Sequence, residues 1–382
     1  MSLSKFKNRR FKPKRRQILL VQSWWEDRVF KGVASYAVEH DWVLDCRMRW
    51  SRELPKTWHG DGIIAYTGIA TPQQHLIDFV KAQRVPVVET QTPRIAGSGA
   101  VVVPHERIGA LAAEHLLSLD FQHIGFVTFA ENVFEAIRRE GARKAVTGAG
   151  ATFHALDFAK FEKQLPSLPK PLGLIALNDI NALGVILACT AAKFSIPEEI
   201  AVIGADDTEI FCDLAPVPIS SVNCDYEEQG RQAAALLDAM MDGKSPPAEP
   251  IVIEPHGVTV RRSTDTVAIP DKDSARFLRY LRDNFRELMN LEQAAQDLGV
   301  SMRRVQDNFR RYLKHTVIQE LTRLRVEHAK KLLQDDPDLK VEAVGMDSGF
   351  ANRFHFMKAF VRVTRQTPGQ YRKSLRNAEA AK

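Results

Sequence analysis

Near its C-terminus the chain reads Leu291-Glu-Gln-Ala-Ala-Gln-Asp-Leu-Gly-Val-Ser-Met-Arg-Arg-Val-Gln-Asp-Asn-Phe309, and this stretch decides how the rest of the sequence is interpreted. Apolar residues recur at three- and four-residue spacing before Gly299, which predicts a helix packed on one face. Gly299 suits a left-handed turn at the end of that helix. Ser301 can then cap a second helix, whose inner face is predicted to carry Val305 and Phe309. The stretch therefore predicts two helices joined by a tight turn.

The outer face of the predicted second helix is rich in arginine. It carries Arg303, Arg304, Arg310 and Arg311. Because an α-helix fits the major groove of DNA, Arg303 and Arg304 near its N-terminus are placed to reach base edges. Later arginines such as Arg310 are expected to contact phosphates, and Ser301 is expected to lie at the DNA where the helix begins.

A second stretch about fifty residues later has the same form, Val341-Glu-Ala-Val-Gly-Met-Asp-Ser-Gly-Phe-Ala-Asn-Arg-Phe-His-Phe-Met-Lys-Ala-Phe360. Its second helix is predicted to place Phe356 and Phe360 on the core side. The expected DNA-contacting residues of this helix are Asn352, Arg353, His355 and Lys358. Asparagine can pair with adenine and arginine with guanine, each through two hydrogen bonds. One such copy alone is equally typical of an amphipathic hairpin in an ordinary helical bundle.

Two copies separated by a helical segment are more specific. Residues 273–376 resemble the AraC/XylS DNA-binding domain in three places: Arg325, Ala329, Leu332 and Leu333 match its connecting helix, Gly349-Phe350 its G-F, and Thr367-Pro368 with Tyr371-Arg372 its closing motif. The resemblance implies two helix-turn-helix units that are tied by one long helix and enter neighbouring major grooves of double-stranded DNA.

Two residues depart from the pattern of that family. Asp307 stands where the family usually carries a basic residue, and Arg365 where a glycine usually ends the last recognition helix. A carboxylate facing a phosphate would be repelled, so Asp307 is expected to face inward or to accept a hydrogen bond from a cytosine amine.

Charge is distributed unevenly along the chain. Residues 1–16 carry a net charge of +8, residues 17–272 of −10 and residues 273–376 of +8, within an overall charge of +6. This asymmetry indicates that the C-terminal part contacts a polyanion and the middle does not. We interpret residues 1–16 as a basic leader, either solvated or lying along DNA, residues 263–272 as a linker and residues 377–382 as a tail.

Several other classes of protein and site are not indicated. No apolar stretch is long enough to span a membrane, and the leader is not a convincing secretion signal. Four cysteines lack the spacing of a metal site or disulfide framework, so we expect a protein of the reducing cytoplasm, associated with the nucleoid, without metal or cofactor. No catalytic elbow, zinc spacing or phosphate-binding loop occurs, so no catalytic residue is predicted.

Residues 17–262 alternate short apolar runs with amphipathic stretches. The expected strands are 17–21, 62–65, 85–88, 123–128, 173–177 and 200–204, and the expected helices include 29–39, 73–83, 107–118 and 180–193. This alternation predicts an α/β fold of parallel sheets with helices on both faces, followed by the all-α domain with its two helix-turn-helix units. Binding sites in such folds lie at the carboxyl ends of the strands.

Several motifs in this part resemble the effector-binding core of LacI/GalR regulators. They include Asp61-Gly-Ile-Ile, His123-Ile-Gly-Phe-Val and Ile196-Pro-Glu-Glu-Ile-Ala-Val-Ile-Gly-Ala-Asp-Asp207. The resemblance implies a periplasmic-binding-protein-like sensor with two lobes, a three-strand hinge and a ligand between the lobes, which close on it. The stretch that begins Val103-Pro-His lacks the aspartate that usually follows this hinge strand.

Six residues are candidates for binding that ligand. Asp179, Asp206 and Arg138 match positions that the family uses to bind ligand oxygens, and Trp24, Trp25 and Asp27 follow the first strand. Carboxylates and guanidinium groups suit a polyol because each can bind two neighbouring hydroxyls, while an aromatic face can stack on a sugar ring. Asp207 is expected to be a turn or cap residue, and one of the two tryptophans can simply pack beneath the loop.

A sensor of this kind joined to an AraC/XylS domain resembles the architecture of the xylose-operon activators. It implies a homodimeric transcription regulator, an activator of carbohydrate-use genes that responds to a sugar such as xylose, with RNA polymerase as a further partner. Two alternatives stay open. The sensor can be a ligand-independent dimerisation module, or the chain can be a sugar-acting enzyme, although the latter leaves the last hundred residues without a role.

Overall fold

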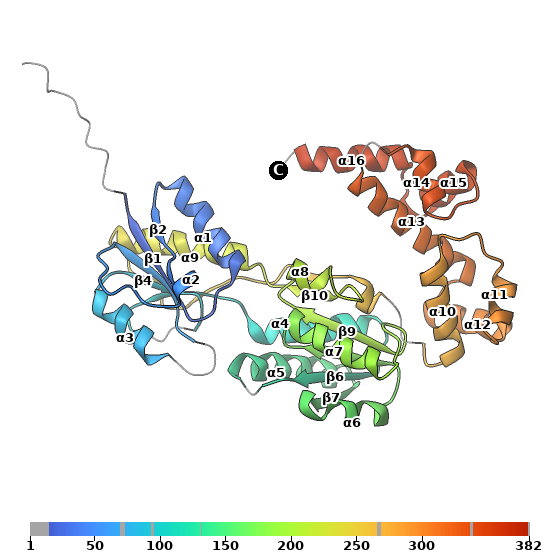
Figure 1. Cartoon of the computed structure of the whole chain (residues 1–382), viewed down its shortest axis with the longest axis horizontal. Coiled ribbons are helices and arrows are strands. Elements are labelled where there is room, and N and C mark those ends of the chain that lie inside the picture. The colour runs from blue at the N-terminus through green and yellow to red at the C-terminus, as the bar shows by residue number, and fades with distance from the viewer. Residues whose placement is uncertain are drawn as a thin grey trace, which may run out of the picture.

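The computed structural model describes residues 15–68, 73–92, 95–130, 132–265, 269–336 and 339–380. Two α/β lobes come first, and a helical part follows them at the C-terminal end of the chain (Figure 1). The predicted fold class is confirmed.

Lobe 1 is built on a parallel sheet of six strands. In chain order they are β1 (Gln17–Gln22), β2 (Val43–Asp45), β3 (Gly62–Tyr66), β4 (Val87–Glu89), β5 (Gly99–Val102) and β11 (Ile251–Val252). Their order in the sheet is β11-β5-β4-β3-β1-β2. The edge strand β11 comes from much later in the chain, so this lobe is made of two separate segments.

Helices cover both faces of the first sheet, as the alternation along β1 requires. Ile18 and Leu20 share one core cluster with α1 (Asp27–Glu39) and α9 (Tyr226–Met241). Leu19 and Val21 share another with α3 (Gln74–Gln83), near the short α2 (Met48–Ser51). Successive side chains of a strand point to opposite faces, so a continuous apolar run identifies a strand buried on both sides.

Lobe 2 has a second six-stranded sheet. Its strands are β6 (His123–Thr128), β7 (Thr152–Asp157), β8 (Leu172–Ala176), β9 (Ile200–Ala205), β10 (Ser220–Asn223) and β12 (Gly257–Thr259). The order is β12-β10-β9-β8-β6-β7, and β12 pairs antiparallel with β10 while the other neighbours are parallel. This antiparallel edge strand was not predicted from the sequence.

The second lobe is also covered on both faces. Its helices are α4 (His105–Ser118), α5 (Val133–Gly148), α6 (Phe161–Gln164), α7 (Asp179–Ala191) and α8 (Glu209–Cys212). The helices α4 and α5 touch backbone to backbone at Gly141, where an added Cβ would lie 2.0 Å from the carbonyl oxygen of Glu106. This close approach explains the glycine that follows Arg138 by three residues.

The chain passes between the lobes three times. It crosses between β5 and α4, between β10 and α9, and between β11 and β12. These three connections agree with the three-strand hinge that the family resemblance implied.

The C-terminal part is entirely helical. It contains α10 (Lys272–Asn284), α11 (Leu291–Asp297), α12 (Met302–Asn308), a π-helical turn η4 (Phe309–Leu313), α13 (Val317–Asp335), α14 (Val341–Asp347), α15 (Arg353–Thr364) and α16 (Pro368–Ala380). The long α13 joins two cores: Leu324 belongs to the core with Val305 and Phe309, and Val326 to the core with Phe356 and Phe360. Both predicted inner faces are therefore confirmed.

Most expected elements lie within a residue or two of their predicted bounds. The strand predicted at 85–88 begins at Val87, and α4 begins two residues earlier than expected, at His105. Ser263 and Thr264, at the start of the predicted linker, are buried, and the Ser263 hydroxyl donates a hydrogen bond to the Val202 carbonyl. Residues 266–268 of that linker and most of the basic leader lie outside the described residues. Among the helices described, none is both long and apolar enough to cross a membrane.

Candidate functional site

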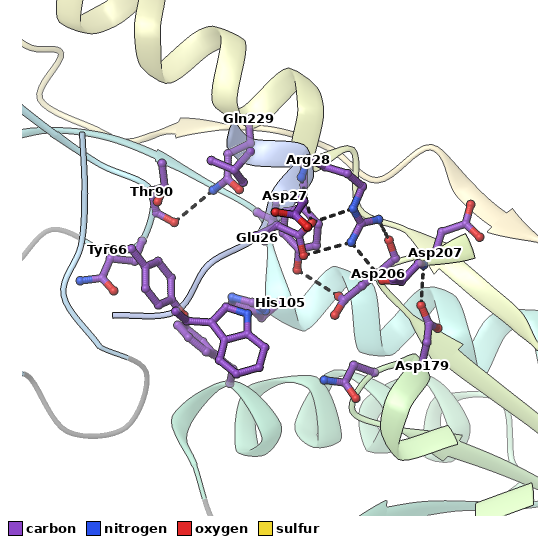
Figure 2. Close-up of a pocket in the computed structure, with 18 of the residues that line it drawn as sticks. Glu26, Asp27, Arg28, Tyr66, Thr90, His105, Asp179, Asp206, Asp207 and Gln229 are labelled. Carbon is purple, nitrogen blue, oxygen red and sulfur yellow. Dashed lines mark hydrogen bonds and ion pairs between the residues drawn. The ribbon is translucent and has the colours of Figure 1, made fainter. Parts of the chain in front are cut away.

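A cavity of about 1020 Å³ lies between the two lobes. The six residues predicted to bind ligand all line it: Trp24, Trp25, Asp27, Arg138, Asp179 and Asp206. The two tryptophans come from the loop after β1, Asp27 from the start of α1 and Arg138 from α5. Asp179 and Asp206 follow β8 and β9, and Figure 2 labels both of them together with Asp27. The structure therefore brings together residues that are up to 182 positions apart, from Trp24 to Asp206.

Arg138 and Asp206 form an ion pair at the floor of the cleft. The Arg138 Nη2 lies 3.0 Å from the Asp206 Oδ1, which also accepts a hydrogen bond from the Tyr226 hydroxyl at 3.0 Å. Burial opposes the charge of Asp206, but Arg138, the Tyr226 hydroxyl and Arg28 together outweigh it, so the pKa of the Asp206 carboxyl is lowered. Asp206 is therefore ionised, and its contacts with Arg138 and Tyr226 fix the orientation of its side chain.

The backbone around this carboxylate is strained. Asp206 has φ 96° and Asp207 has φ 55°, a region that non-glycine residues rarely adopt. Asp207 is held by Thr259 and Arg261, at 2.6 and 2.7 Å, and thus stabilises the turn. This agrees with its predicted role as a turn residue, and the turn directs Asp206 toward the cleft.

Asp179 lies deeper and is already engaged. Its side chain is 1% exposed. It accepts hydrogen bonds from the Ser221 hydroxyl at 2.5 Å and from the Thr208 backbone N–H at 2.7 Å. Burial, reinforced by the nearby Asp206, raises the pKa of the Asp179 carboxyl to about 7. Asp179 lines the cavity, and its hydrogen bond to Thr208 also stabilises the turn after β9.

The two tryptophans after β1 differ in their environments. Trp24 is 62% exposed at the cleft. Trp25 is half-buried and packs on Phe30 with ring centroids 5.3 Å apart. Asp27 forms an ion pair with Arg49, so its carboxylate is not free in this structure. Trp24 accordingly offers the aromatic face, while Trp25 fixes the loop.

Arg28 is an important cleft residue that the sequence analysis missed. Its guanidinium crosses from lobe 1 to lobe 2, donating to the Asp206 carbonyl and, at 3.2 Å, to the Thr208 hydroxyl (Figure 2). Glu26 holds it at 2.8 Å, and it lies over the Tyr226 ring at 5.0 Å from the centroid. A signal was present in Glu26-Asp27-Arg28, three consecutive charges that begin four residues after the end of a buried strand.

His105 was also missed, although it stands in the stretch that departs from the LacI/GalR pattern. Its Nδ1 accepts a hydrogen bond from the Arg138 Nε at 3.2 Å, and its ring stacks on Phe134 at 4.2 Å. Burial, together with the positive Arg138, lowers the pKa of His105 to about 3. A neutral imidazole therefore orients Arg138 from behind.

Two buried polar atoms of cleft-lining residues have no hydrogen-bond partner among the described residues. They are the Trp25 Nε1 and the Gln91 Oε1. Buried polar groups are nearly always paired, because an unpaired one costs about 1–3 kcal/mol. A donor and an acceptor of this kind are what a hydroxyl-rich ligand can satisfy.

The second candidate surface is formed by the helices α12 and α15 of the C-terminal part. Ser301 caps α12, since its side chain accepts a hydrogen bond from the Arg304 backbone N–H. Arg303, Arg304 and Arg310 are all exposed. Arg304 forms an ion pair with Asp271, and Arg310 lies 3.9 Å from Asp307.

The corresponding helix of the second unit, α15, runs over 12 residues without the π-helical turn that follows α12. Asn352 caps α15 by accepting a hydrogen bond from the His355 backbone N–H, at 2.9 Å. Arg353, His355 and Lys358 are exposed, and Arg353 is 2.7 Å from Glu342. The Asn352 oxygen is therefore already used in a cap, whereas its amide N–H groups stay available.

The structure clarifies the two departures from the AraC/XylS pattern. Asp307 does not face inward, because its side chain is 64% exposed and lies near Arg310, so that part of the expectation is wrong. Arg365 ends α15 with φ 61°, the left-handed conformation that a glycine adopts without strain. The arginine therefore keeps the turn that the family glycine would make, at some cost in stability.

No group of three or more potential metal ligands occurs among the residues that the structure describes. Cys189, Cys212 and Cys224 are buried and Cys46 half-buried, all as free thiols. Burial raises the pKa of the Cys189 thiol to about 12, which makes it unreactive.

Comparison with protein families finds two domains. A periplasmic binding protein-like domain matches residues 113–264, and a helix-turn-helix domain matches residues 294–374. The first match begins within α4 and covers the rest of lobe 2 together with α9 and β11, and the second begins within α11 and runs into α16.

Curated relatives with this organisation are transcription regulators. The xylose operon regulatory protein of Escherichia coli strain K12 is 25% identical over 379 residues, covering 91% of this chain and 94% of the relative. The protein of the same description from Haemophilus influenzae is 28% identical over 227 residues, 58% of each chain. These relatives are regulators, not enzymes.

Solved structures agree on the fold. A structure described as the xylose-binding transcription activator xylR superposes with a TM-score of 0.74 at 22% identity, covering 95% of this chain and 99% of the other. A cellobiose complex of the regulator CelR superposes with a TM-score of 0.52 at 22% identity, covering 66% of this chain and 86% of the other. The activator structure thus contains the two lobes together with the helical part, and the CelR structure matches the two lobes.

Proposed function

We infer that this chain, a transcription regulator with a periplasmic-binding-protein-like sensor and an AraC-type helix-turn-helix domain, changes its binding to operator DNA when a monosaccharide occupies the cleft. The observation that carries the proposal is the composition of the cleft. The oriented pair of Asp206 and Arg138 lines the same cavity as Trp25 and Gln91, whose Nε1 and Oε1 atoms have no partner among the described residues, and Trp24 is exposed there.

The ligand that this chemistry favours is a small polyol. Carboxylate, guanidinium and amide groups offer hydrogen bonds to hydroxyls, and the Trp24 and Phe134 rings provide apolar surface for the C–H face of a sugar. Xylose is our first candidate, because the relatives with the same organisation are named for it. In this proposal the sugar is contacted by Asp206, Arg138 and Trp24 and accepts a hydrogen bond from the Trp25 indole nitrogen. Asp179 holds the turn after β9, and Asp27 is paired with Arg49.

Closure of the lobes is the motion that we propose for the sensor. Arg28 already spans from α1 to the turn after β9, so it can hold the closed arrangement. A ligand shifts the equilibrium between open and closed lobes only by its difference in affinity for the two. Contacts from both lobes to one sugar supply that difference.

We further propose that α12 and α15 enter neighbouring major grooves of the operator. Arg303, Arg353, His355 and Lys358 would then face the bases or the backbone, and Ser301, Arg304, Arg310 and Asn352 would set the ends of the helices. The positive charge of residues 273–376 supports the phosphate contacts, which dominate affinity and make it salt-dependent.

The remaining parts of the proposal concern assembly and location. We propose a cytoplasmic homodimer that activates carbohydrate-use genes through RNA polymerase. We assign the sensor to residues 17–262, the linker to 263–272 and the DNA-binding domain to 273–376, between the basic leader 1–16 and the tail 377–382.

A selection from random duplex DNA followed by footprinting tests this proposal. The bound DNA is expected to contain two adjacent half-sites per domain, and D-xylose is expected to change its affinity by about 5- to 150-fold. Calorimetry with D-xylose and other aldoses on the full chain provides the second arm. Sequence-specific protection without heat from any aldose would mean that the sensor is a ligand-independent dimerisation module, and no protected bases at all would overturn the assignment of the DNA-binding surface.

A further inference from the structure

A buried ionic cluster lies where lobe 2 meets the helical part. Glu198 comes from the loop between α7 and β9 and is 2% exposed, and Arg282 comes from α10 and is 7% exposed. The Arg282 Nη1 lies 3.4 Å from the Glu198 Oε1, and its Nη2 lies 4.0 Å from the Glu320 Oε1 of α13. One arginine therefore connects a carboxylate of the sensor with a carboxylate of the DNA-binding part.

We propose that the Glu198 loop of lobe 2 is the docking surface for α10 and α13, and that the Glu198–Arg282–Glu320 contact is the joint through which lobe motion reaches the DNA-binding helices. This inference rests on the proposed function for the direction in which the signal runs, but the docking surface itself does not depend on it.

The first argument is that the two carboxylates are held very differently. Glu320 is fixed within its own domain by Arg323 at 2.8 Å and by His315 at 2.9 Å. These partners outweigh burial and lower the pKa of Glu320 to about 2. Burial raises the pKa of Glu198, which has Arg282 as its cationic contact. The sensor side of the joint is therefore the weakly held side.

The buried ionic cluster is incompletely paired. The Glu198 Oε2 and the Arg282 Nε are buried and have no hydrogen-bond partner among the described residues. A buried ion pair repays its desolvation only with good geometry and further hydrogen bonds. On the Glu198 side the cluster has one long contact, at 3.4 Å, beside a buried oxygen without a partner among the described residues, so the desolvation is only partly offset. A displacement of the loop therefore changes the pairing of Glu198.

A single buried strand connects the Glu198 loop to the ligand site. Strand β9 (Ile200–Ala205) is buried at every residue; it starts directly after Glu199 and ends directly before Asp206. The Ser263 hydroxyl donates to the Val202 carbonyl in the middle of the same strand, which ties the exit from the sensor to it. The joint and the cleft carboxylate are thus the two ends of one strand.

Two further ion pairs cross the same boundary. Arg262 lies 2.5 Å from Asp283, and Arg323 lies 3.4 Å from Asp265. Both involve side chains that are at least 35% exposed, so each contributes little by itself. They add exposed contacts across the boundary, whereas the buried cluster provides the contact that depends most on geometry.

The test replaces Glu198 by Gln in the full chain and compares it with Glu199→Gln. The control carries the same change one residue away, at a carboxylate whose hydrogen-bond partner among the described residues is Ser195 of the same loop. Hydrogen exchange by mass spectrometry reports on docking, and affinity for the selected DNA with and without D-xylose reports on coupling.

Glu198→Gln is expected to speed exchange in α10 at least fivefold and to reduce the effect of D-xylose on DNA affinity at least about fivefold, while Glu199→Gln does neither. If Glu198→Gln does not fold, the pair Glu198→Met with Arg282→Met removes both charges, and the same loss of coupling is expected. Unchanged exchange in α10 would overturn the docking surface. Faster exchange with a full D-xylose effect would overturn the joint. If no aldose changes the DNA affinity of the wild type, the proposed sugar response fails, and the exchange data alone decide the docking surface.

Discussion

The cleft and the DNA-binding surface both pair an arginine with a carboxylate, but the pair is buried in the cleft and exposed on the surface. In the cleft, Arg138 is 4% exposed and is paired with Asp206, which is 19% exposed. On the DNA-binding surface, Arg353 is 65% exposed and is paired with Glu342, which is 59% exposed. Buried pairs are costly to break, whereas exposed pairs are worth about 0–1 kcal/mol. Substitutions in the cleft should therefore affect folding and ligand response together, and those on the surface should affect DNA binding alone.

The largest effect is expected for Asp206→Ala. It leaves the Arg138 guanidinium buried without its carboxylate, so the free energy of unfolding should fall by about 3–5 kcal/mol and the ligand response should be lost. Urea unfolding and calorimetry measure the two. Asp213→Ala, which removes an exposed carboxylate that pairs with Arg261, should cost less than about 1 kcal/mol. Equal losses in both variants would remove the contrast between buried and exposed pairs.

The pH dependence of stability should come next. The pKa of Asp179 is about 7 in the folded chain and about 3.9 when unfolded, so the folded state keeps a proton between these values. The free energy of unfolding should accordingly fall by about 2–4 kcal/mol as pH rises from about 4 to 7, and then level off.

His105 changes stability in the opposite direction in the same pH range, because its pKa is lowered to about 3. The informative quantity is therefore the difference between the wild type and Asp179→Asn in urea unfolding at each pH. That difference in the free energy of unfolding should change by about 2–4 kcal/mol between about pH 4 and pH 7. A difference that is flat across the range would show that Asp179 is ionised in the folded chain.

On the DNA-binding surface, Arg353→Ala should weaken binding to the selected DNA by about 1–3 kcal/mol and relax its base preference at one position. The free energy of unfolding should change by less than about 1 kcal/mol, because only an exposed pair is lost. Gel-shift titrations on selected and random duplexes provide the measurement. An equal loss on both DNAs would identify Arg353 as a phosphate contact only.

The smallest effect is expected for Arg365→Gly. This residue is exposed and has φ 61°, so a glycine should relieve strain and stabilise the last helix-turn-helix unit by about 0.5–1 kcal/mol. Thermal unfolding should show a slightly higher midpoint without a change in DNA affinity. A lower midpoint would mean that the arginine side chain makes a contact worth more than the strain.

The same contrast explains what could be predicted from the sequence. The strands β1, β6 and β9 were evident because an apolar run identifies a strand buried on both faces. The helix-turn-helix units were evident because Gly299 and Gly349 mark their turns, and both have positive φ in the structure. Periodicity and turn chemistry are local properties, so they can be deduced without knowing the fold.

The missed features are all contacts between distant segments. Arg28 reaches Asp206, 178 residues away, and Arg282 reaches Glu198, 84 residues away. Neither arginine belongs to a periodic pattern that names its partner. The same holds for β12, because Gly257–Thr259 is too short to be recognised before β10 is known to lie beside it.

The pairing of β5 with β11 has a consequence for biogenesis. Val101 pairs with Ile251, so lobe 1 obtains its edge strand and the covering helix α9 only after five of the six strands of lobe 2 have been synthesised. The five preceding strands of lobe 1 must wait on the ribosome with part of their apolar surface uncovered, while lobe 2 can begin to form its own core. Pauses in translation after β10 should therefore expose the emerging chain to chaperones, because both sheets still lack an edge strand at that point.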